Sequence, residues 1–158
     1  MYMNMNKIEL KLKIELVAST PWYDNLRKKT SKTEWDKIRK QSYADANHKC
    51  AICGADGRLN CHEIWEYDDK THIQKLTGFI ALCNDCHMIK HIGFAGIQAS
   101  KGLLDMEKLI EHFMKVNNCN REVFEKHLEE AFAQWRERSK HEWQVDLGAY
   151  TDVIERRR

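Results

Sequence analysis

Two Cys-x-x-Cys pairs restrict what this chain can fold into more than any other feature of its sequence. The first pair lies in CAICGADG and the second in LCNDCH. Each pair bends its backbone so that both sulfurs face one point, and two pairs complete a tetrahedral four-thiolate zinc site. Such a site has no open coordination position, so it supports folding rather than chemistry. We therefore predict a structural Zn²⁺ held by Cys50, Cys53, Cys83 and Cys86, with reduced core thiols or a redox pair as the alternative.

Length and composition indicate one domain over 1–158. The chain has 158 residues, of which 42% are hydrophobic and 32% charged, as in an ordinary globular protein with a buried core. No run of about 18 apolar residues occurs, and the N-terminus lacks the apolar core of a signal sequence. We expect a cytoplasmic protein without a membrane partner. In that reducing compartment, six cysteines indicate metal binding rather than disulfides.

The overall charge does not by itself indicate a nucleic-acid partner. Lys and Arg number 26 against 24 Asp and Glu, which gives a net charge of +2. Local basic clusters do occur, and one of them follows the aromatic pair of PWYDNLR. Arg27 and Lys28 in this cluster are candidates for phosphate contact, with a solvated surface as the alternative.

Hydrophobic periodicity predicts an α+β fold in three segments. Segment 1–47 contains an N-terminal strand and a helix, segment 48–97 contains the cysteine pairs, and segment 98–158 is a helical extension that ends in a short strand and a polar tail. The expected elements are, in chain order, a strand over 7–16, a helix over 33–47 capped by Ser31 or Thr33, strands over 58–67 and 78–83, helices over 84–97, 105–117 and 120–139, and a strand over 143–147.

Three histidines predict a second metal site. His87 and His91 are four residues apart on the helix expected over 84–97, so their rings project from one face about one turn apart. That spacing is typical of metal-binding histidine pairs on helices. His62 lies between the two cysteine pairs, on a strand that a folded hairpin would direct toward the same helix. We expect these three side chains to share one divalent ion.

The order of these ligands over residues 48–97 resembles that of the HNH, or ββα-metal, nuclease family. The Cys pair, the histidine-bearing hairpin and the LC..CH...H sequence that opens a helix carry the resemblance. It implies a zinc-stapled ββα-metal core in which a colicin-DNase-like set of three histidines holds a catalytic ion. It also implies an endonuclease that hydrolyses phosphodiester bonds, which we expect to be those of DNA. Lys90, between the two helical histidines, is then a candidate for phosphate contact.

The sequence departs from the family pattern in two places. The first strand carries His-Glu where family members commonly carry Asp-His or His-His. The register we prefer makes His62 a ligand and Glu63 the general base, or a carboxylate that orients a ligand. A shift by one residue would instead make Cys61 the ligand and His62 the base. The asparagine of the family name has no counterpart, because Gly78 occupies its expected place.

The ligand types also limit which ions and which functions are candidates. Neutral imidazoles suit Zn²⁺, Ni²⁺ or Mn²⁺, whereas Mg²⁺ prefers oxygen ligands. All four ions remain candidates for the catalytic ion, in addition to the structural Zn²⁺. The alternative function is a non-catalytic, zinc-stabilised module that binds nucleic acid or protein on a degenerate HNH fold, including an inhibitor or accessory protein. The helical extension could serve as a homodimer interface.

Overall fold

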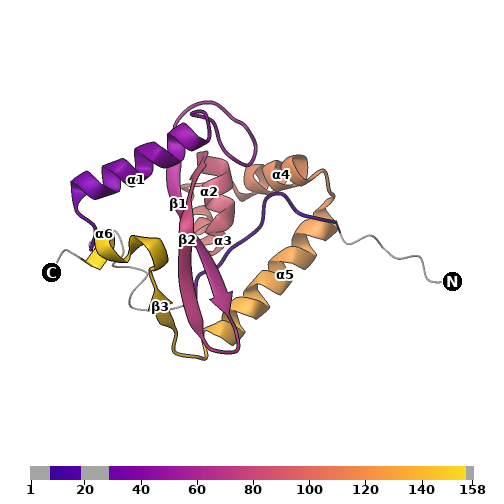
Figure 1. Cartoon of the computed structure of the whole chain (residues 1–158). Coiled ribbons are helices and arrows are strands. Elements are labelled where there is room, and N and C mark those ends of the chain that lie inside the picture. Colours follow the sequence, from indigo (N-terminus) through magenta and orange to yellow (C-terminus); the bar gives the residue numbers. More distant parts are fainter. Residues whose placement is uncertain (1–7, 19–28, 156–158) are drawn as a thin grey trace.

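A β-hairpin between helices organises the fold (Figure 1). The structure is a computed structural model and describes residues 8–18 and 29–155. Strands β1 (Asn60–Asp68) and β2 (Ile73–Leu82) are antiparallel, and the short β3 (Gln144–Asp146) runs parallel to β2 on its other side. In the described sheet β1 is therefore an edge strand. The α+β class predicted from the sequence is confirmed.

Helices cover both faces of the hairpin. Phe79 on β2 makes an edge-on ring contact with Trp35 of the first helix, whereas the next residue, Ile80, packs into the main core on the opposite face. The helices are α1 (Lys32–Asp45), α2 (Asn84–Lys90), α3 (Ile92–Ser100), α4 (Met106–Asn117), α5 (Arg121–Arg138) and α6 (Thr151–Glu155), with a short 3-10 helix at Gly148–Tyr150. Helix α2 follows β2 almost directly and packs against the hairpin and α4.

Side-chain caps fix where several helices begin. Ser31 Oγ accepts a hydrogen bond from the backbone N–H of Glu34 at 3.1 Å, as predicted for a cap at this position. Asp105 caps α4 and Asn120 caps α5 in the same way. The predicted helices over 33–47, 105–117 and 120–139 are confirmed, with ends that shift by one or two residues.

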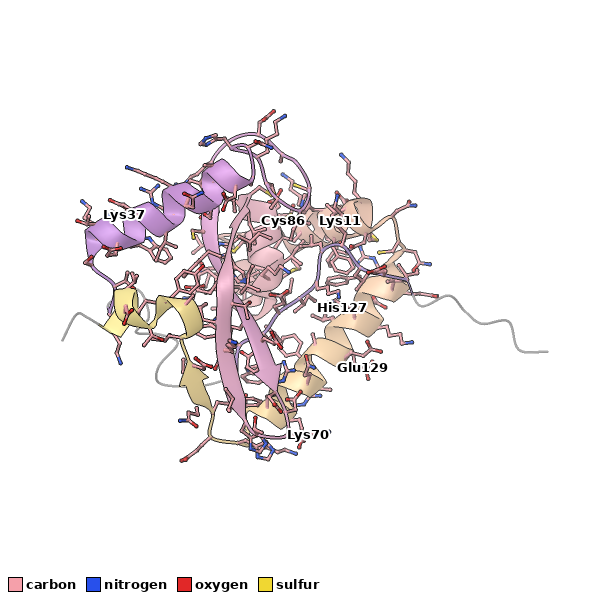
Figure 2. The ribbon with its side chains drawn as sticks, viewed as in Figure 1. Lys11, Lys37, Lys70, Cys86, His127 and Glu129 are labelled. Atoms are coloured by element: carbon pink, nitrogen blue, oxygen red, sulfur yellow. The ribbon has the colours of Figure 1, made fainter. Side chains whose placement is uncertain are left out.

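The N-terminal segment, residues 8–18, is extended but joins no sheet, so the strand predicted over 7–16 is wrong for the part that the structure describes. Its burial does alternate, because Leu12 and Ile14 are buried and the lysines beside them are exposed. Asn117 of α4 accepts from Leu12 N–H at 2.8 Å and donates to Leu12 O at 2.9 Å. His127, labelled on α5 in Figure 2, accepts from Ile14 N–H at 2.9 Å. Helix side chains thus replace a neighbouring strand as hydrogen-bond partners.

The helix predicted over 84–97 is two helices, which meet at His91. This residue has φ −105° and ψ 48°, outside the helical region, so α2 ends and α3 begins there. The chain nevertheless stays wound, since His91 N–H donates to His87 O at 3.2 Å and Ala95 N–H donates to His91 O at 3.0 Å. The one-turn spacing of the two histidines is therefore kept.

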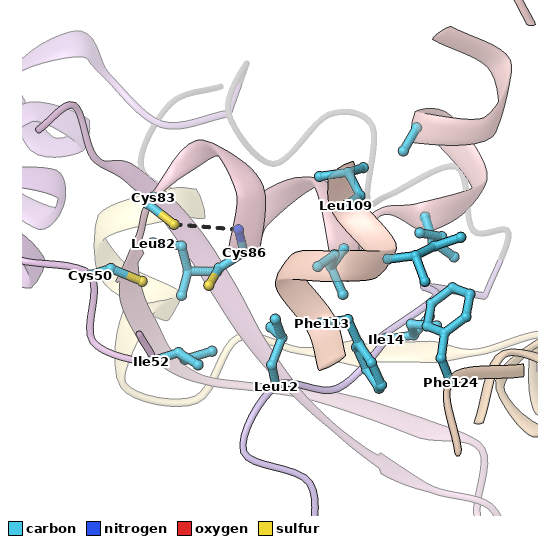
Figure 3. Close-up of a cluster of buried hydrophobic side chains, with 14 residues drawn as sticks. Leu12, Ile14, Cys50, Ile52, Leu82, Cys83, Cys86, Leu109, Phe113 and Phe124 are labelled. Carbon is cyan, nitrogen blue, oxygen red and sulfur yellow. Dashed lines mark hydrogen bonds between the residues drawn. The ribbon is translucent and has the colours of Figure 1, made fainter. Parts of the chain in front are cut away.

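The main core lies between the hairpin, the N-terminal segment and helices α2 to α5. Phe113, Leu12 and Ile89 are fully buried in it, and cysteine sulfurs are part of the same cluster. Figure 3 shows Cys83 and Cys86 close to Leu82 in this core. A smaller cluster on the other side of the sheet consists of Leu76, Leu147 and Ile154. Residues 148–155, which were expected to be a polar tail, fold there as a 3-10 helix and α6 because Ile154 is buried.

Replacing Asn117 tests how the N-terminal segment is held. We expect Asn117→Ala to lower the free energy of unfolding by about 2–3 kcal/mol, because two buried main-chain groups of Leu12 lose their partner. Urea unfolding followed by circular dichroism measures the change. Asn84→Ala is the control, because its exposed amide bonds Asn60 at the surface. An equal loss in both variants would contradict the role given to Asn117.

Candidate metal centres

The four cysteines predicted to bind zinc lie together. The sulfurs of Cys50, Cys53, Cys83 and Cys86 are all within 4.8 Å of one another, and Cys53 Sγ lies 3.6 Å from Cys83 Sγ. Four sulfurs bound tetrahedrally at about 2.3 Å from one ion would lie about 3.8 Å apart. The group, here called the sulfur site, can therefore hold a structural metal ion such as zinc.

Local backbone geometry builds the sulfur site from two similar turns. Cys53 N–H points at Cys50 Sγ at 3.5 Å, and Cys86 N–H points at Cys83 Sγ at 3.4 Å (dashed line in Figure 3). Gly54 continues the first turn with φ 76°, a conformation that costs glycine little. Ala51 N–H donates to Ala81 O at 2.9 Å, which ties the first turn to the end of β2 just before the second.

Burial and mutual repulsion keep these thiols from ionising together. Burial raises the pKa of Cys83 to about 11 and also raises the pKa of Cys86, and neighbouring thiolates add to both effects. Burial also raises the pKa of Cys50, but backbone hydrogen bonds outweigh it and bring this pKa down to about 7. Four ionised sulfurs therefore require a cation among them, which is the condition that a divalent metal ion meets.

His112 contacts the sulfur site, which the sequence did not predict. Its Nε2 lies 3.2 Å from Cys86 Sγ. Burial lowers the pKa of His112, so the ring is neutral at pH 7 and can donate one N–H to a thiolate. No spacing in the sequence pairs His112 with another residue, because the contact arises from the packing of α4 against α2.

Three histidines form a second group, here called the histidine site. Ligand nitrogens of His62 on β1, His87 on α2 and His91 at the α2–α3 junction lie within 4.8 Å of one another. The ring centroids are 5.4 Å apart for His62 and His87, 4.9 Å for His62 and His91, and 4.8 Å for His87 and His91. One ion about 2.1 Å from each nitrogen needs only small ring movements at this spacing. The donor set fits a divalent ion.

His87 and His91 are suited to metal binding because their rings are neutral. Burial lowers the pKa of His87 to about 4, and the nearby His62 adds to the effect. The pKa of His91 is lowered to about 4 for the same reasons. At neutral pH each ring therefore keeps a lone pair that a cation can use.

The structure places His62, and not Cys61, in this group. His62 is 3% exposed and sits opposite Ile80 across the hairpin. Cys61 and Glu63 alternate with it and line a cavity with α1. The register irregularity of the hairpin falls between Ile64 and Trp65, one step beyond Glu63, so it does not bring the two neighbours onto one face.

A cavity of about 250 Å³ lies beside β1 and opens onto the histidine site. Its lining is Trp35, Arg39 and Tyr43 from α1, Asn60, Cys61 and Glu63 from β1, and His87 and His91. Arg39 brings a permanent positive charge, with its guanidinium 3.1 Å from Asp36 and 5.7 Å from the ring centroid of Tyr43. The three α1 residues are four apart in sequence, and that spacing alone could have grouped them on one helix face.

Lys90, which was predicted to contact phosphate, instead forms a buried ion pair. Lys90 is 6% exposed, and its Nζ lies 2.7 Å from Glu15 Oε1, so it does not face the cavity. Burial raises the pKa of Glu15, but the nearby His62 ring and the Lys90 ammonium outweigh it and lower this pKa to about 2. Arg27 and Lys28 lie outside the described residues.

In comparisons with protein families, with curated proteins and with solved structures, nothing matches this chain. Within the described residues, no helix combines the length and the apolar character that crossing a membrane requires. The chemistry of the two sites therefore rests on their own geometry.

Cys86→Ser tests the sulfur site. We expect this variant to lose bound zinc and about 4 kcal/mol or more of unfolding free energy, because metal binding in such a site contributes directly to folding. Elemental analysis and thermal unfolding measure both effects. Cys119→Ser is the control, since Cys119 lies outside the group and should leave the zinc in place. Full zinc content in Cys86→Ser would show that the sulfur site is not a metal site.

The histidine site predicts a specific dependence of stability on pH. An unfolded histidine has a pKa of about 6.5, whereas the folded His87 and His91 have a pKa of about 4. The unfolded chain thus binds more protons between these values, so stability is lost as the pH falls from about 6.5 to about 4. Relative to His87→Ala/His91→Ala, the wild-type chain should lose unfolding free energy over this range in denaturant titrations without added metal. A difference that does not change with pH would contradict the depressed pKa values.

Proposed function

We propose that this protein is a metal-dependent endonuclease of the HNH (ββα-metal) type that hydrolyses phosphodiester bonds in DNA. The observation that carries the proposal is the convergence of three imidazoles, two of which line a cavity, together with a separate sulfur site. The chain order supports it, because the hairpin β1–β2 leads directly into α2 and the ligands come from both parts. This is the arrangement that the sequence resemblance implies.

The histidine site has the ligand set of a reactive centre rather than a structural one. A divalent ion bound there would stabilise negative charge on the phosphate and on the leaving oxygen. Three nitrogen ligands leave coordination positions for water and phosphate, whereas four thiolates leave none. Imidazole favours Zn²⁺, Ni²⁺ or Mn²⁺ over Mg²⁺. The sulfur site would keep the hairpin and α2 in place, and the histidine site would act on the substrate.

Glu63 is the proposed general base. Its carboxylate lines the same cavity as His87 and His91, where it can take a proton from the attacking water. Because neighbours alternate along β1, Glu63 does not compete with His62 for the ion. That separation of roles agrees with the register in which His62 is a ligand.

Arg39 replaces Lys90 as the proposed phosphate contact in the cavity. A guanidinium binds phosphate oxygens through two parallel hydrogen bonds and remains charged at any relevant pH. Trp35 and Tyr43 flank Arg39 on the same helix face and give the cavity an aromatic wall against which a base could stack. Helix α1 would thus position the DNA strand, while residues of β1 and α2 act on its phosphate.

The second candidate function is a non-catalytic module that binds nucleic acid or protein, and Gly78 favours it. This residue occupies the place where the resemblance expects an asparagine. The nearest atom to a Cβ added at Gly78 would be Ile64 Cδ1 at 3.7 Å, an ordinary contact, so the hairpin itself does not require a glycine. Lack of room for a Cβ therefore does not explain the absence of the asparagine.

Plasmid cleavage separates the two functions. We expect the purified protein to nick or linearise plasmid DNA with Mn²⁺, Ni²⁺ or Zn²⁺, and His87→Ala to lose at least about 100-fold in rate because a ligand is removed. Glu63→Gln should lose about 100-fold while still binding metal, because only the base is lost. His141→Ala is the control, an exposed histidine outside both sites. Equal cleavage by wild type and His87→Ala would reject the nuclease, and DNA binding without cleavage would favour the second function.

A further inference from the structure

The N-terminal segment brings a carboxylate to the histidine site. Glu15 Oε2 lies 3.8 Å from His62 Nε2, and Glu15 Oε1 lies 2.7 Å from Lys90 Nζ. The backbone N–H of Glu15 also donates to Lys90 O at 3.3 Å, so main chain and side chain both bond the residue before His91. Glu15 is not among the residues that line the cavity, so its carboxylate reaches the rings from another side.

Helix α5 fixes the position of Glu15 along the segment. His127 accepts from Ile14 N–H at 2.9 Å, and Trp135 Nε1 donates to Val17 O at 3.0 Å. These bonds lie on either side of Glu15 and hold its backbone against the helices. The position of the carboxylate is therefore set by packing, and not by its bond to Lys90 alone.

The two ring nitrogens of His62 have different surroundings. The ring is 3% exposed, and its Nε2 faces Glu15. Its Nδ1 is buried and has no hydrogen-bond partner among the described residues. A buried polar atom without a partner is destabilising, because it has lost its hydrogen bonds to water. An ion shared with His87 and His91 would satisfy Nδ1, and histidine ligands usually donate their other N–H to a carboxylate or a carbonyl.

We propose that Glu15 is a positioning residue for the histidine site. A closer approach from the present 3.8 Å lets its carboxylate accept the Nε2–H of His62, which leaves the lone pair on the buried Nδ1 for the ion. This inference rests on the proposed function only in that the histidine site binds a divalent ion. It extends the site to a segment 47 positions before His62 in the sequence.

Lys90 completes the arrangement through its charge. Its ammonium is buried beside the site of a cation, where an unpaired positive charge would repel the ion. The Glu15 carboxylate neutralises that charge at 2.7 Å and is itself held by the pair. Removing Glu15 therefore has two effects, because His62 loses its acceptor and the ion gains an unpaired neighbouring ammonium.

Metal titration of matched variants tests the proposal. With zinc already in the sulfur site, calorimetric titration with Ni²⁺ should show that Glu15→Ala binds roughly 10–100-fold more weakly than wild type at the histidine site. Glu15→Gln/Lys90→Met keeps an acceptor for Nε2–H and removes the unpaired ammonium, so its affinity should stay within a few-fold of wild type. Glu9→Ala, an exposed acid of the same segment, should leave the affinity unchanged.

A second readout does not depend on bound metal. Nitrogen-15 NMR of the protein with an empty histidine site should show His62 protonated at Nε2 in wild type and a mixture of both tautomers in Glu15→Ala. Unchanged Ni²⁺ affinity together with an unchanged tautomer in Glu15→Ala would overturn the positioning role. Absence of Ni²⁺ binding in wild type would refute the metal site on which the proposed function rests, whereas the tautomer of His62 tests the Glu15–His62 contact by itself.

Discussion

The convergence of four cysteine sulfurs is the constraint on which the rest of the structure depends. The first pair precedes β1 and the second opens α2, so bringing them together closes the hairpin and fixes the helix against it. Burial raises the pKa of Cys83 and Cys86, which makes four adjacent thiolates unstable without a cation. A metal ion in the sulfur site would therefore hold His62 opposite His87 and His91, and the geometry of the second site follows from the first.

The two sites differ in charge as much as in ligand type. The sulfur site gathers groups that must ionise to bind a metal, whereas His87 and His91 of the histidine site are already neutral at pH 7. Around the rings, Glu15 and Lys90 form an ion pair whose charges cancel. The histidine site therefore offers lone pairs without a large fixed charge, and the cavity beside it contributes Arg39 and Glu63. This combination suits an anionic substrate and an ion with open coordination positions.

Local spacing predicted which cysteines and histidines lie together, because local backbone geometry controls their placement. A Cys-x-x-Cys turn directs both sulfurs to one point whatever the surrounding fold, and residues four apart share a helix face even where the chain breaks at His91. The strand predicted over 7–16 failed for a different reason. Alternating burial indicates one buried face, but it does not say whether a strand or helix side chains such as Asn117 satisfy the backbone.

Contacts between distant segments could not be predicted from the sequence. Glu15 bonds Lys90, 75 positions away, and His112 reaches Cys86 only through the packing of α4 on α2. Lys90 is buried as well, although helix periodicity alone had left it free to meet a phosphate. The cavity wall from α1 likewise depends on how that helix lies against the hairpin.

X-ray absorption spectroscopy at the nickel edge tests the central claim most directly, on protein that carries zinc in its sulfur site and one equivalent of added Ni²⁺. We predict a nickel ion coordinated by three imidazole nitrogens and by water oxygens, with no sulfur ligand. Nickel that stays in solution, or that binds sulfur in place of the imidazoles, would contradict a shared ion at His62, His87 and His91.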